Sequence, residues 1–268
     1  MALQLKSASP AQGARWLRDG FRLFGRSPLA FSLLFVSFLA TALLASMLPL
    51  LGPVLLFCAM PLVSLGFMVA AESSLAGGRV HPGQFITPLR GDAQKRRSLL
   101  VLCGLHGLAL VVAMALSDAV DGGAFDALVR SGAQGQRPQE VEALVGDPRL
   151  AQGLALRFGL MALLSVPFWH APALVHWGGQ GPAQALFSST LAMWRNKAAF
   201  IVYLVAWVGM IGLFGVVTSL LAGLLNARQI VGHLTLPAGL VFSTVFYVSL
   251  IFTFHDSFGG TEAVVSAP

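Results

Sequence analysis

Six apolar stretches, each long enough to cross a lipid bilayer, constrain this 268-residue chain more than any motif does. They cover approximately residues 28–51, 53–73, 99–116, 154–177, 198–225 and 234–254. A helix needs about 20 apolar residues to cross the hydrocarbon core, and lipid offers the backbone no hydrogen-bond partners outside a helix. With 56% apolar and 10% charged residues, a soluble domain of this length would lack polar surface. We therefore predict an all-α, polytopic membrane bundle of six transmembrane helices.

A Pro-small-Gln triplet recurs along the chain, as Pro10-Ala11-Gln12, Pro82-Gly83-Gln84 and Pro182-Ala183-Gln184. A short basic stretch and two apolar stretches follow each triplet. This recurrence predicts one membrane domain over residues 1–268, built from units that each combine a surface helix with a helical hairpin. The predicted units cover about residues 10–74, 82–177 and 182–254, followed by a flexible cytoplasmic tail at 255–268.

The cations indicate how the bundle is oriented. Most of the 17 lysines and arginines lie before the first apolar stretch, between the second and third, and between the fourth and fifth. The positive-inside rule places these connections and both termini in the cytoplasm. Residues 117–152 are predicted to form a mostly irregular external loop with one short helix near 138–144. We interpret its carboxylates as solvated: Asp118, Asp121, Asp126, Glu140, Glu142 and Asp147.

The N-terminal stretch has the pattern of a helix that lies in the headgroup plane of a membrane. Leu17, Phe21 and Phe24 share one face of a helical wheel, arginines occupy the other, and Trp16 is predicted at the interface. Each cation near an anionic surface contributes about 1 kcal/mol without selectivity, so a simple anchor that orients the bundle is an alternative interpretation. The candidate contacts with anionic lipids are Arg15, Arg18, Arg22, Arg26, Arg96, Arg97 and Arg195.

Four polar side chains are candidates for an intramembrane site, because ionisable groups in lipid are costly and are usually retained for packing or function. They are Glu72, His106, His170 and Asn196. We place both histidines about 10–12 Å deep from the cytoplasmic side. The four side chains are interpreted as the lining of a cytoplasm-facing cavity for a lipid headgroup or small amphiphile. Alternatively, they cap helix ends and bond to one another, or the two histidines ligate a haem or metal.

Several classes of function are not expected. The chain contains no second matched histidine pair and no cysteine pair, so we expect no metal and no cofactor. It has no GxSxG motif and no phosphate-binding glycine loop, so we expect no enzyme. The net charge of +6 is spread over membrane-proximal connections without interleaved aromatic residues, so we expect no nucleic-acid partner.

Two local patterns predict helix packing and helix breaking. Gly215, Ser219 and Gly223 recur every four residues, which is typical of a stripe that packs closely against another helix. Pro167 and Pro172 flank the centre of the fourth stretch and should kink that helix or open its hydrogen-bond ladder.

The chain resembles a family at FWHAPALVHW (168–177), ALFSS (185–189), WRN (194–196) and the opening GARWLRDGF (13–21). The family is that of uncharacterised integral inner-membrane proteins from Burkholderia-like proteobacteria, and the resemblance covers essentially all six stretches. The surface-helix-plus-hairpin unit is more distantly similar to YciC-like proteins and to the membrane region of some glycerophosphodiester phosphodiesterases, whose catalytic domain is absent here. The resemblance implies a multi-pass protein of the bacterial inner membrane and implies no activity.

Two functions follow from these observations. The first is a non-enzymatic interaction or membrane-organising protein, whose partners are anionic phospholipids of the bilayer and another membrane protein. The second is a binder or carrier of a lipid or small amphiphile, held in the predicted intramembrane cavity.

Overall fold

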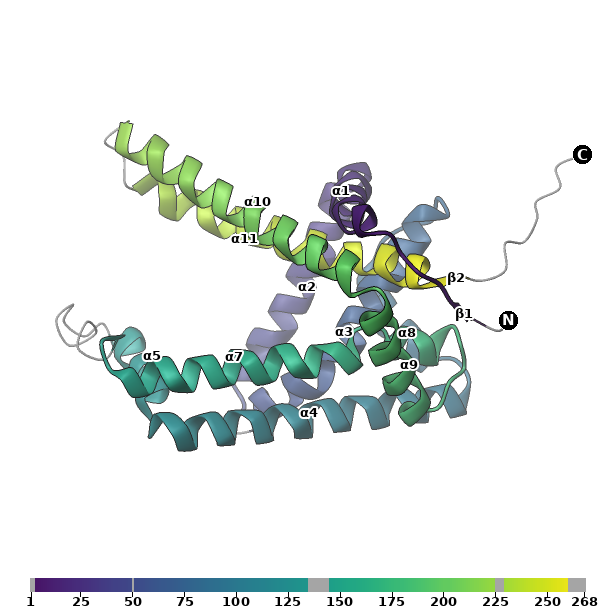
Figure 1. Ribbon diagram of the computed structural model, residues 1–268, viewed down its shortest axis with the longest axis horizontal. Coiled ribbons are helices and arrows are strands. Elements are labelled where there is room, and N and C mark those ends of the chain that lie inside the picture. The colour runs from purple at the N-terminus through teal and green to yellow at the C-terminus, as the bar shows by residue number, and fades with distance from the viewer. Residues whose placement is uncertain (1–2, 50, 135–144, 225–228, 260–268) are drawn as a thin grey trace, which may run out of the picture.

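A computed structural model of the chain describes residues 3–49, 51–134, 145–224 and 229–259. The described part is mainly helical, with one pair of short strands (Figure 1). Its elements are β1 (Gln4–Leu5), α1 (Pro10–Arg26), α2 (Pro28–Ser46), α3 (Leu51–Leu75), η1 (Pro82–Phe85), η2 (Thr87–Leu89), α4 (Ala93–Asp121), α5 (Ala124–Gln134), α7 (Pro148–Phe168), α8 (Ala171–His176), α9 (Pro182–Arg195), α10 (Lys197–Leu224), α11 (Gln229–Ser257) and β2 (Phe258–Gly259). Six helical segments are long and apolar enough to cross a membrane, the fourth being α7 and α8 together. The predicted all-α polytopic bundle is confirmed.

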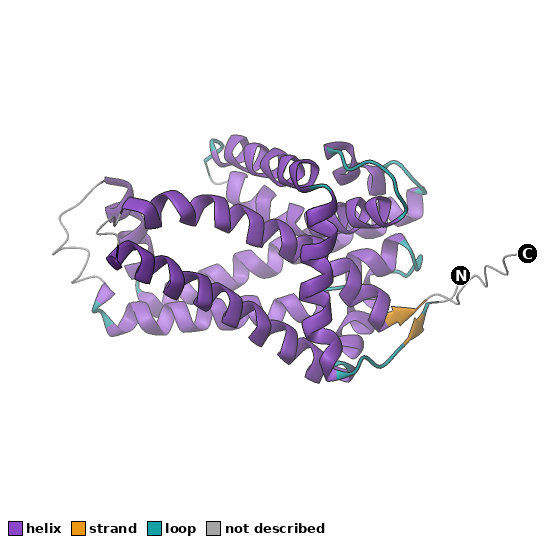
Figure 2. Ribbon diagram, turned by 90° about the horizontal axis from the view of Figure 1, so that it is seen from above, coloured by secondary structure: helices purple, strands orange, loops and turns teal. Residues whose placement is uncertain are grey.

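Three helical hairpins, α2–α3, α4–α7 and α10–α11, share one end of the bundle. We call it the terminal end, because β1 and β2, the first and last described elements, pair there as antiparallel strands (Figures 1 and 2). Helix α3 is central and packs against α2, α4 and α11. The α4–α7 and α10–α11 hairpins diverge as they leave the terminal end (Figure 1). The shared core therefore lies near this end, and the far halves of the hairpins expose many apolar side chains.

The Pro-small-Gln triplets prove to be helix starts. Pro10 begins α1, and the Gln12 side chain accepts a hydrogen bond from the N–H of Ser9. At η1 the Gln84 side chain accepts from the N–H of His81 at 3.0 Å. Proline suits the first helical position, where an N–H would be unpaired, and glutamine at the third closes a capping box. Each triplet therefore begins a helix with proline, but only the first two have a capping box, because the N-cap of α9 is Gly181. The second unit begins with two short 3-10 helices.

Helix α1 is amphipathic, but its apolar face packs on protein. It contacts α10 and α11 closely at two glycines, where a Cβ on Gly13 would collide with the backbone of α10 and one on Gly20 would lie 2.7 Å from the Cβ of Ser249. Trp16 is 1% exposed, and its Nε1 donates to Asp256 at 2.7 Å. The predicted interfacial position of Trp16 is therefore wrong, because the glycines admit α1 deeply enough to bury the indole.

Helical structure reaches further into the acidic region than predicted. Helix α4 continues to Asp121, α5 follows, and α7 begins at Pro148. The described part of 117–152 is therefore largely helical, and the prediction of a mostly irregular loop is wrong for it. The short helix predicted near 138–144 lies outside the described residues.

The predicted flexible tail is wrong for its first residues. Residues 255–257 complete α11, and 258–259 form β2, which pairs with β1. Next to this pair, the N–H of Lys6 donates to the carbonyl of Ser257 at 2.9 Å. The N-terminal segment thus supplies the backbone partners that order 255–259, and residues 260–268 lie outside the described part.

The small-residue stripe on α10 does not pack as predicted. A Cβ on Gly215 or Gly223 would meet nothing within 4 Å among the described residues, and Ser219 is exposed. The stripe lies on the far half of α10, where the α10–α11 hairpin has left the rest of the bundle (Figure 1). The prediction that it contacts another helix of the same chain is therefore wrong.

Candidate intramembrane ligand site

Pro61 leaves a carbonyl oxygen in α3 without its helical partner, and His106 from α4 takes that place. In an α-helix the carbonyl of Phe57 would accept from the N–H of residue 61, which proline lacks. The Nδ1 atom of His106 lies 2.7 Å from the Phe57 oxygen. The neighbouring Gly107 lets α4 approach this closely, because a Cβ there would overlap Cys58. The imidazole is therefore held in one orientation between α3 and α4.

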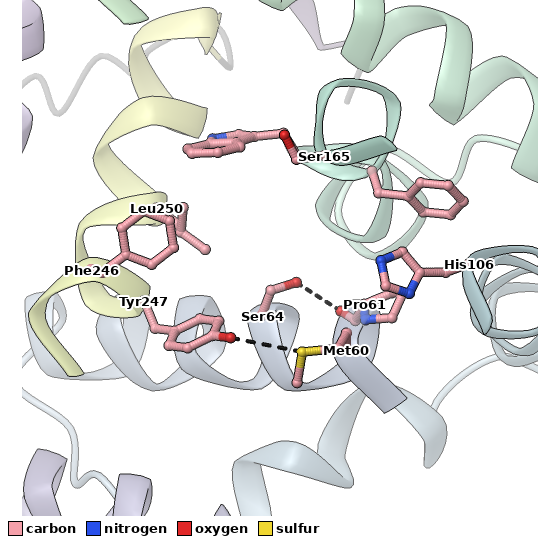
Figure 3. A pocket seen from close by; sticks show the side chains of 10 residues that line it. Met60, Pro61, Ser64, His106, Ser165, Phe246, Tyr247 and Leu250 are labelled. Carbon is pink, nitrogen blue, oxygen red and sulfur yellow. Dashed lines mark hydrogen bonds between the residues drawn. The ribbon is translucent and has the colours of Figure 1, made fainter. Parts of the chain in front are cut away.

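This imidazole lines a cavity of about 190 Å³ where α3, α4, α7 and α11 meet (Figure 3). Most of the lining residues are half-buried, so the cavity opens at the surface of the bundle. Its lining is mainly aromatic and aliphatic. The lining residues are Met60, Pro61, Ser64, His106, Ser165, Phe168, Trp169, Phe246, Tyr247 and Leu250.

The hydroxyl groups in this cavity already have partners. Ser64 donates to the carbonyl of Pro61 at 2.9 Å, and Ser165 donates to that of Ala162 at 2.7 Å, both within their own helices. The hydroxyl of Tyr247 faces the sulfur of Met60 at 3.9 Å (Figure 3), which is a weak acceptor. The cavity therefore presents mainly hydrogen-bond acceptors.

The cavity lies several helical turns away from the terminal end. His106 is about 20 Å along α4 from the start of that helix at Ala93, taking 1.5 Å per residue. Ser165 and Tyr247 lie about 15 Å from the helix ends at the terminal end by the same measure. The hydrocarbon core is about 30 Å thick. The predicted depth of 10–12 Å was counted from the start of the apolar stretch at Leu99, six residues after the start of α4, and it stays a prediction.

The break between α7 and α8 confirms the prediction made from Pro167 and Pro172. Helix α7 ends at Phe168 and α8 begins at Ala171. Ser189 of α9 bridges the opened ladder: it accepts from the N–H of His170 at 3.0 Å and donates to the carbonyl of Val166 at 3.1 Å. The stretches 168–177 and 185–189, which carry the predicted family resemblance, therefore contain the α7–α8 break and the serine of α9 that bridges it.

His170 lies at this helix break and does not line the cavity. It is fully buried, and its Nε2 lies 3.1 Å from the hydroxyl of Thr253 on α11. His106 has a different partner on a different helix. The structure therefore does not bring the two histidines together as a ligand pair.

Asn196 and Glu72 bond near the terminal end. Asn196 accepts from the N–H of Ala8 at 2.7 Å and donates to the carbonyl of Lys6 and the hydroxyl of Ser257, each at 3.2 Å. Glu72 lies 3.0 Å from Nε2 of His255. Of the four predicted cavity residues only His106 lines the cavity described here. The other three bond locally because they lie where helices end or break.

The candidate lipid-contacting arginines are all exposed. Four of them lie on the outward face of α1, where Asp19 is 3.2 Å from Arg18 and 3.5 Å from Arg22. Arg96 and Arg97 lie in the first turns of α4. Arg195 closes α9 and donates to Ser7 at 2.8 Å. These positions surround the terminal end.

Sequence reasoning missed a buried ion cluster at the opposite end of the bundle. Arg157 of α7 donates to Asp118 and, at 3.4 Å, to Asp121, and its guanidinium lies 3.8 Å from the centre of the Phe125 ring. The Asp121 side chain is fully buried, so the interpretation of Asp121 as solvated is wrong, whereas the Asp118 side chain is 52% exposed. Two features of the sequence could have indicated this cluster. The two aspartates are three residues apart, which places both on one helix face, and Arg157 lies inside an apolar stretch.

The comparisons with known proteins agree with this architecture. No protein-family model matches the chain, and no solved structure matches it. A curated protein of Burkholderia thailandensis, named a probable inner membrane protein, is 33% identical over 265 residues, which cover 97% of this chain and 96% of that protein. The predicted resemblance to Burkholderia-like inner-membrane proteins is thereby confirmed, while the YciC-like similarity stays a prediction. This chain, a multi-pass protein of the inner membrane, belongs to the family of that probable inner membrane protein.

Proposed function

We propose that this protein is a non-enzymatic binder of a membrane-resident lipid or small amphiphile, which it holds in the cavity lined by His106. The observation that carries the proposal is an open, mainly apolar cavity between four candidate membrane spans, with an oriented imidazole in its wall. Apolar pockets with a few placed polar groups are the usual form of small-molecule sites. At about 190 Å³ the cavity suits one end of such a ligand and not a whole phospholipid.

The divergence of the hairpins supports lateral entry of the ligand. The α4–α7 and α10–α11 hairpins separate as they leave the terminal end (Figure 1), and residues of both line the cavity. The remainder of a long ligand would lie outside the cavity, against the exposed apolar side chains of these hairpins. Entry from the bilayer would not require the ligand to cross the headgroup region.

The same proposal places both termini in the cytoplasm. The cation-rich connections and the exposed arginines of α1, α4 and α9 all lie at the terminal end. The positive-inside rule assigns such an end to the cytoplasmic face. Reaction of single cysteines introduced at Ser7 and at Val145 with a membrane-impermeant reagent, in right-side-out and inverted vesicles, would test this orientation.

Photolabelling in native-like membranes tests the binding site. The full chain in lipid nanodiscs would be labelled with a long-chain amphiphile that carries a diazirine, and the adducts mapped by mass spectrometry. We expect adducts on cavity residues, lost in Ser165→Phe, which fills the cavity. Leu163→Phe is the matched control, because Leu163 lies on the same helix and is 67% exposed outside the cavity. Equal labelling of both variants and the wild type would refute the site.

A second function, recruitment of anionic lipid or of another membrane protein, is favoured by the geometry of α1. Its buried face is fixed on α10 and α11, so Arg15, Arg18, Arg22 and Arg26 are presented on a rigid outer face. Replacing Arg15, Arg18 and Arg22 with glutamine should reduce the anionic phospholipid or the partner protein retained after gentle extraction, measured by native mass spectrometry. Unchanged retention would count against this second function.

A further inference from the structure

We infer that the ligand of the His106 cavity is a neutral lipid with a free hydroxyl group, which donates a hydrogen bond to Nε2 of His106. This inference rests on the proposed function and specifies the chemistry of its ligand. It starts from the position of one proton on the imidazole.

The partner of Nδ1 determines where that proton is. A carbonyl oxygen accepts hydrogen bonds and cannot donate, so Nδ1 of His106 must carry the hydrogen shared with Phe57. The described lining of the cavity contains no carboxylate that would balance a charged imidazole, and an apolar site disfavours the charge. In the neutral ring with a proton on Nδ1, Nε2 is an acceptor.

Nε2 is an acceptor without a partner. Within the described residues it receives no hydrogen bond, and the ring of Phe168 packs edge-on against the imidazole at 4.8 Å between centroids. Ser64 and Ser165 add oxygen lone pairs, because their protons are bonded to carbonyls of their own helices. A ligand that satisfies this cavity must therefore bring a donor.

The hydrogen-bonding groups of the cavity lining also exclude acidic headgroups. The described lining holds no lysine or arginine. A phosphate or carboxylate would face lone pairs on His106, Ser64 and Ser165, and only the Tyr247 hydroxyl, which has the weak acceptor Met60 as its partner, could turn to donate to it. A hydroxyl group fits both conditions, because it can donate to Nε2 and accept from Tyr247. Its neutral charge also suits a site lined mainly by apolar side chains.

The test compares an alcohol with its methyl ether, which replaces the donor proton with a methyl group. An unlabelled long-chain alcohol and its methyl ether would each compete with the diazirine probe for wild-type protein in nanodiscs. We expect the alcohol to displace the probe at about one tenth of the ether concentration, which is the effect of one neutral hydrogen bond. In His106→Phe the two should compete equally, whereas Ser64→Ala should keep most of the preference.

The outcomes separate this inference from the proposed function. If the alcohol and ether compete equally in the wild type, the cavity binds amphiphiles but the hydroxyl inference is wrong. It is also wrong if a fatty acid of the same length competes better than the alcohol, or if His106→Phe keeps the preference. If no labelling depends on the cavity, as judged with Ser165→Phe, the proposed function itself fails. Should His106→Phe not fold, the wild-type ratio alone decides.

Discussion

The Nδ1 atom of His106 lies 2.7 Å from the carbonyl oxygen of Phe57, and this hydrogen bond joins α4 to α3. It exists because Pro61 cannot supply the N–H that would otherwise bond to Phe57. A proline in one membrane helix thus determines the tautomer of a histidine in another. The acceptor character of the cavity follows from this arrangement.

Replacing Pro61 should therefore change the cavity without touching His106. In Pro61→Ala the helix gains an N–H for Phe57, and the imidazole is free to rotate or to move its proton to Nε2. We expect the tenfold preference for alcohol over ether to fall toward one, measured in the same competition assay. Pro53→Ala is the control, because Pro53 lies outside the cavity lining. A preserved preference in Pro61→Ala would show that the Phe57 bond does not orient the ring.

Arg157 should be far more sensitive to substitution than a surface arginine. Removing it leaves Asp121 buried without its charge partner, which typically costs about 3–5 kcal/mol. We expect Arg157→Met to lower the thermal unfolding midpoint strongly in detergent, and Arg157→Met with Asp121→Leu to recover most of the loss. Asp118→Asn should have a smaller effect because Asp118 is half-exposed. Additive losses in the double variant would contradict a coupled cluster.

Asn196 should hold the N-terminal segment in place. Asn196→Ala removes three hydrogen bonds and leaves the N–H of Ala8 without its acceptor, at a cost of about 1–3 kcal/mol. We expect faster amide hydrogen exchange and faster proteolysis at residues 3–9. Lys197→Ala, at the exposed neighbouring position, should leave both rates unchanged. Equal protection in the two variants would show that β1 is held by the strand pairing alone.

Two glycines of α1 should respond oppositely to the same change. Gly13→Leu introduces atoms where the backbone of α10 already lies, so we expect a loss of about 1–3 kcal/mol or more. A Cβ on Gly25 meets nothing within 4 Å among the described residues, so Gly25→Leu should be neutral or gain up to about 1 kcal/mol in helix propensity. The thermal unfolding midpoints of both variants test this prediction. Equal changes in the two midpoints would mean that α1 does not pack closely against α10 at Gly13.

The membrane helices were predictable from sequence because composition and length alone decide which segments cross a bilayer. The broken fourth span was also predictable, because proline breaks a helix through its own covalent structure. The burial of Trp16 and the hydrogen bond from His106 to α3 were not predicted, for a reason common to both residues. Their surroundings depend on which helices pack together and how far each helix extends, and the sequence pattern of one helix does not contain that information. The exposed arginine face of α1 could be read from its own periodicity, but the burial of the opposite face could not.

The cavity itself left only partial signals in the sequence. Pro61 within an apolar stretch indicates that the carbonyl of Phe57 needs a new donor, but not that α4 supplies it. The close approach of α4 depends on Gly107 meeting Cys58. Ser64, Ser165 and Tyr247 carry no motif and become neighbours only through the meeting of α3, α7 and α11.

The packing of α1 on α10 and α11 also has a consequence for the order of synthesis. The ribosome makes α1 first and its two partner helices last, so Trp16 cannot be buried, nor β1 paired with β2, until nearly the whole chain has been translated and inserted. A chain that stops before α10 would expose the apolar face of its first helix at the membrane surface. The burial of Trp16 and the pairing of β1 with β2 therefore follow the synthesis of all the other described helices, so the segment from β1 to α1 is among the last parts to reach its final contacts.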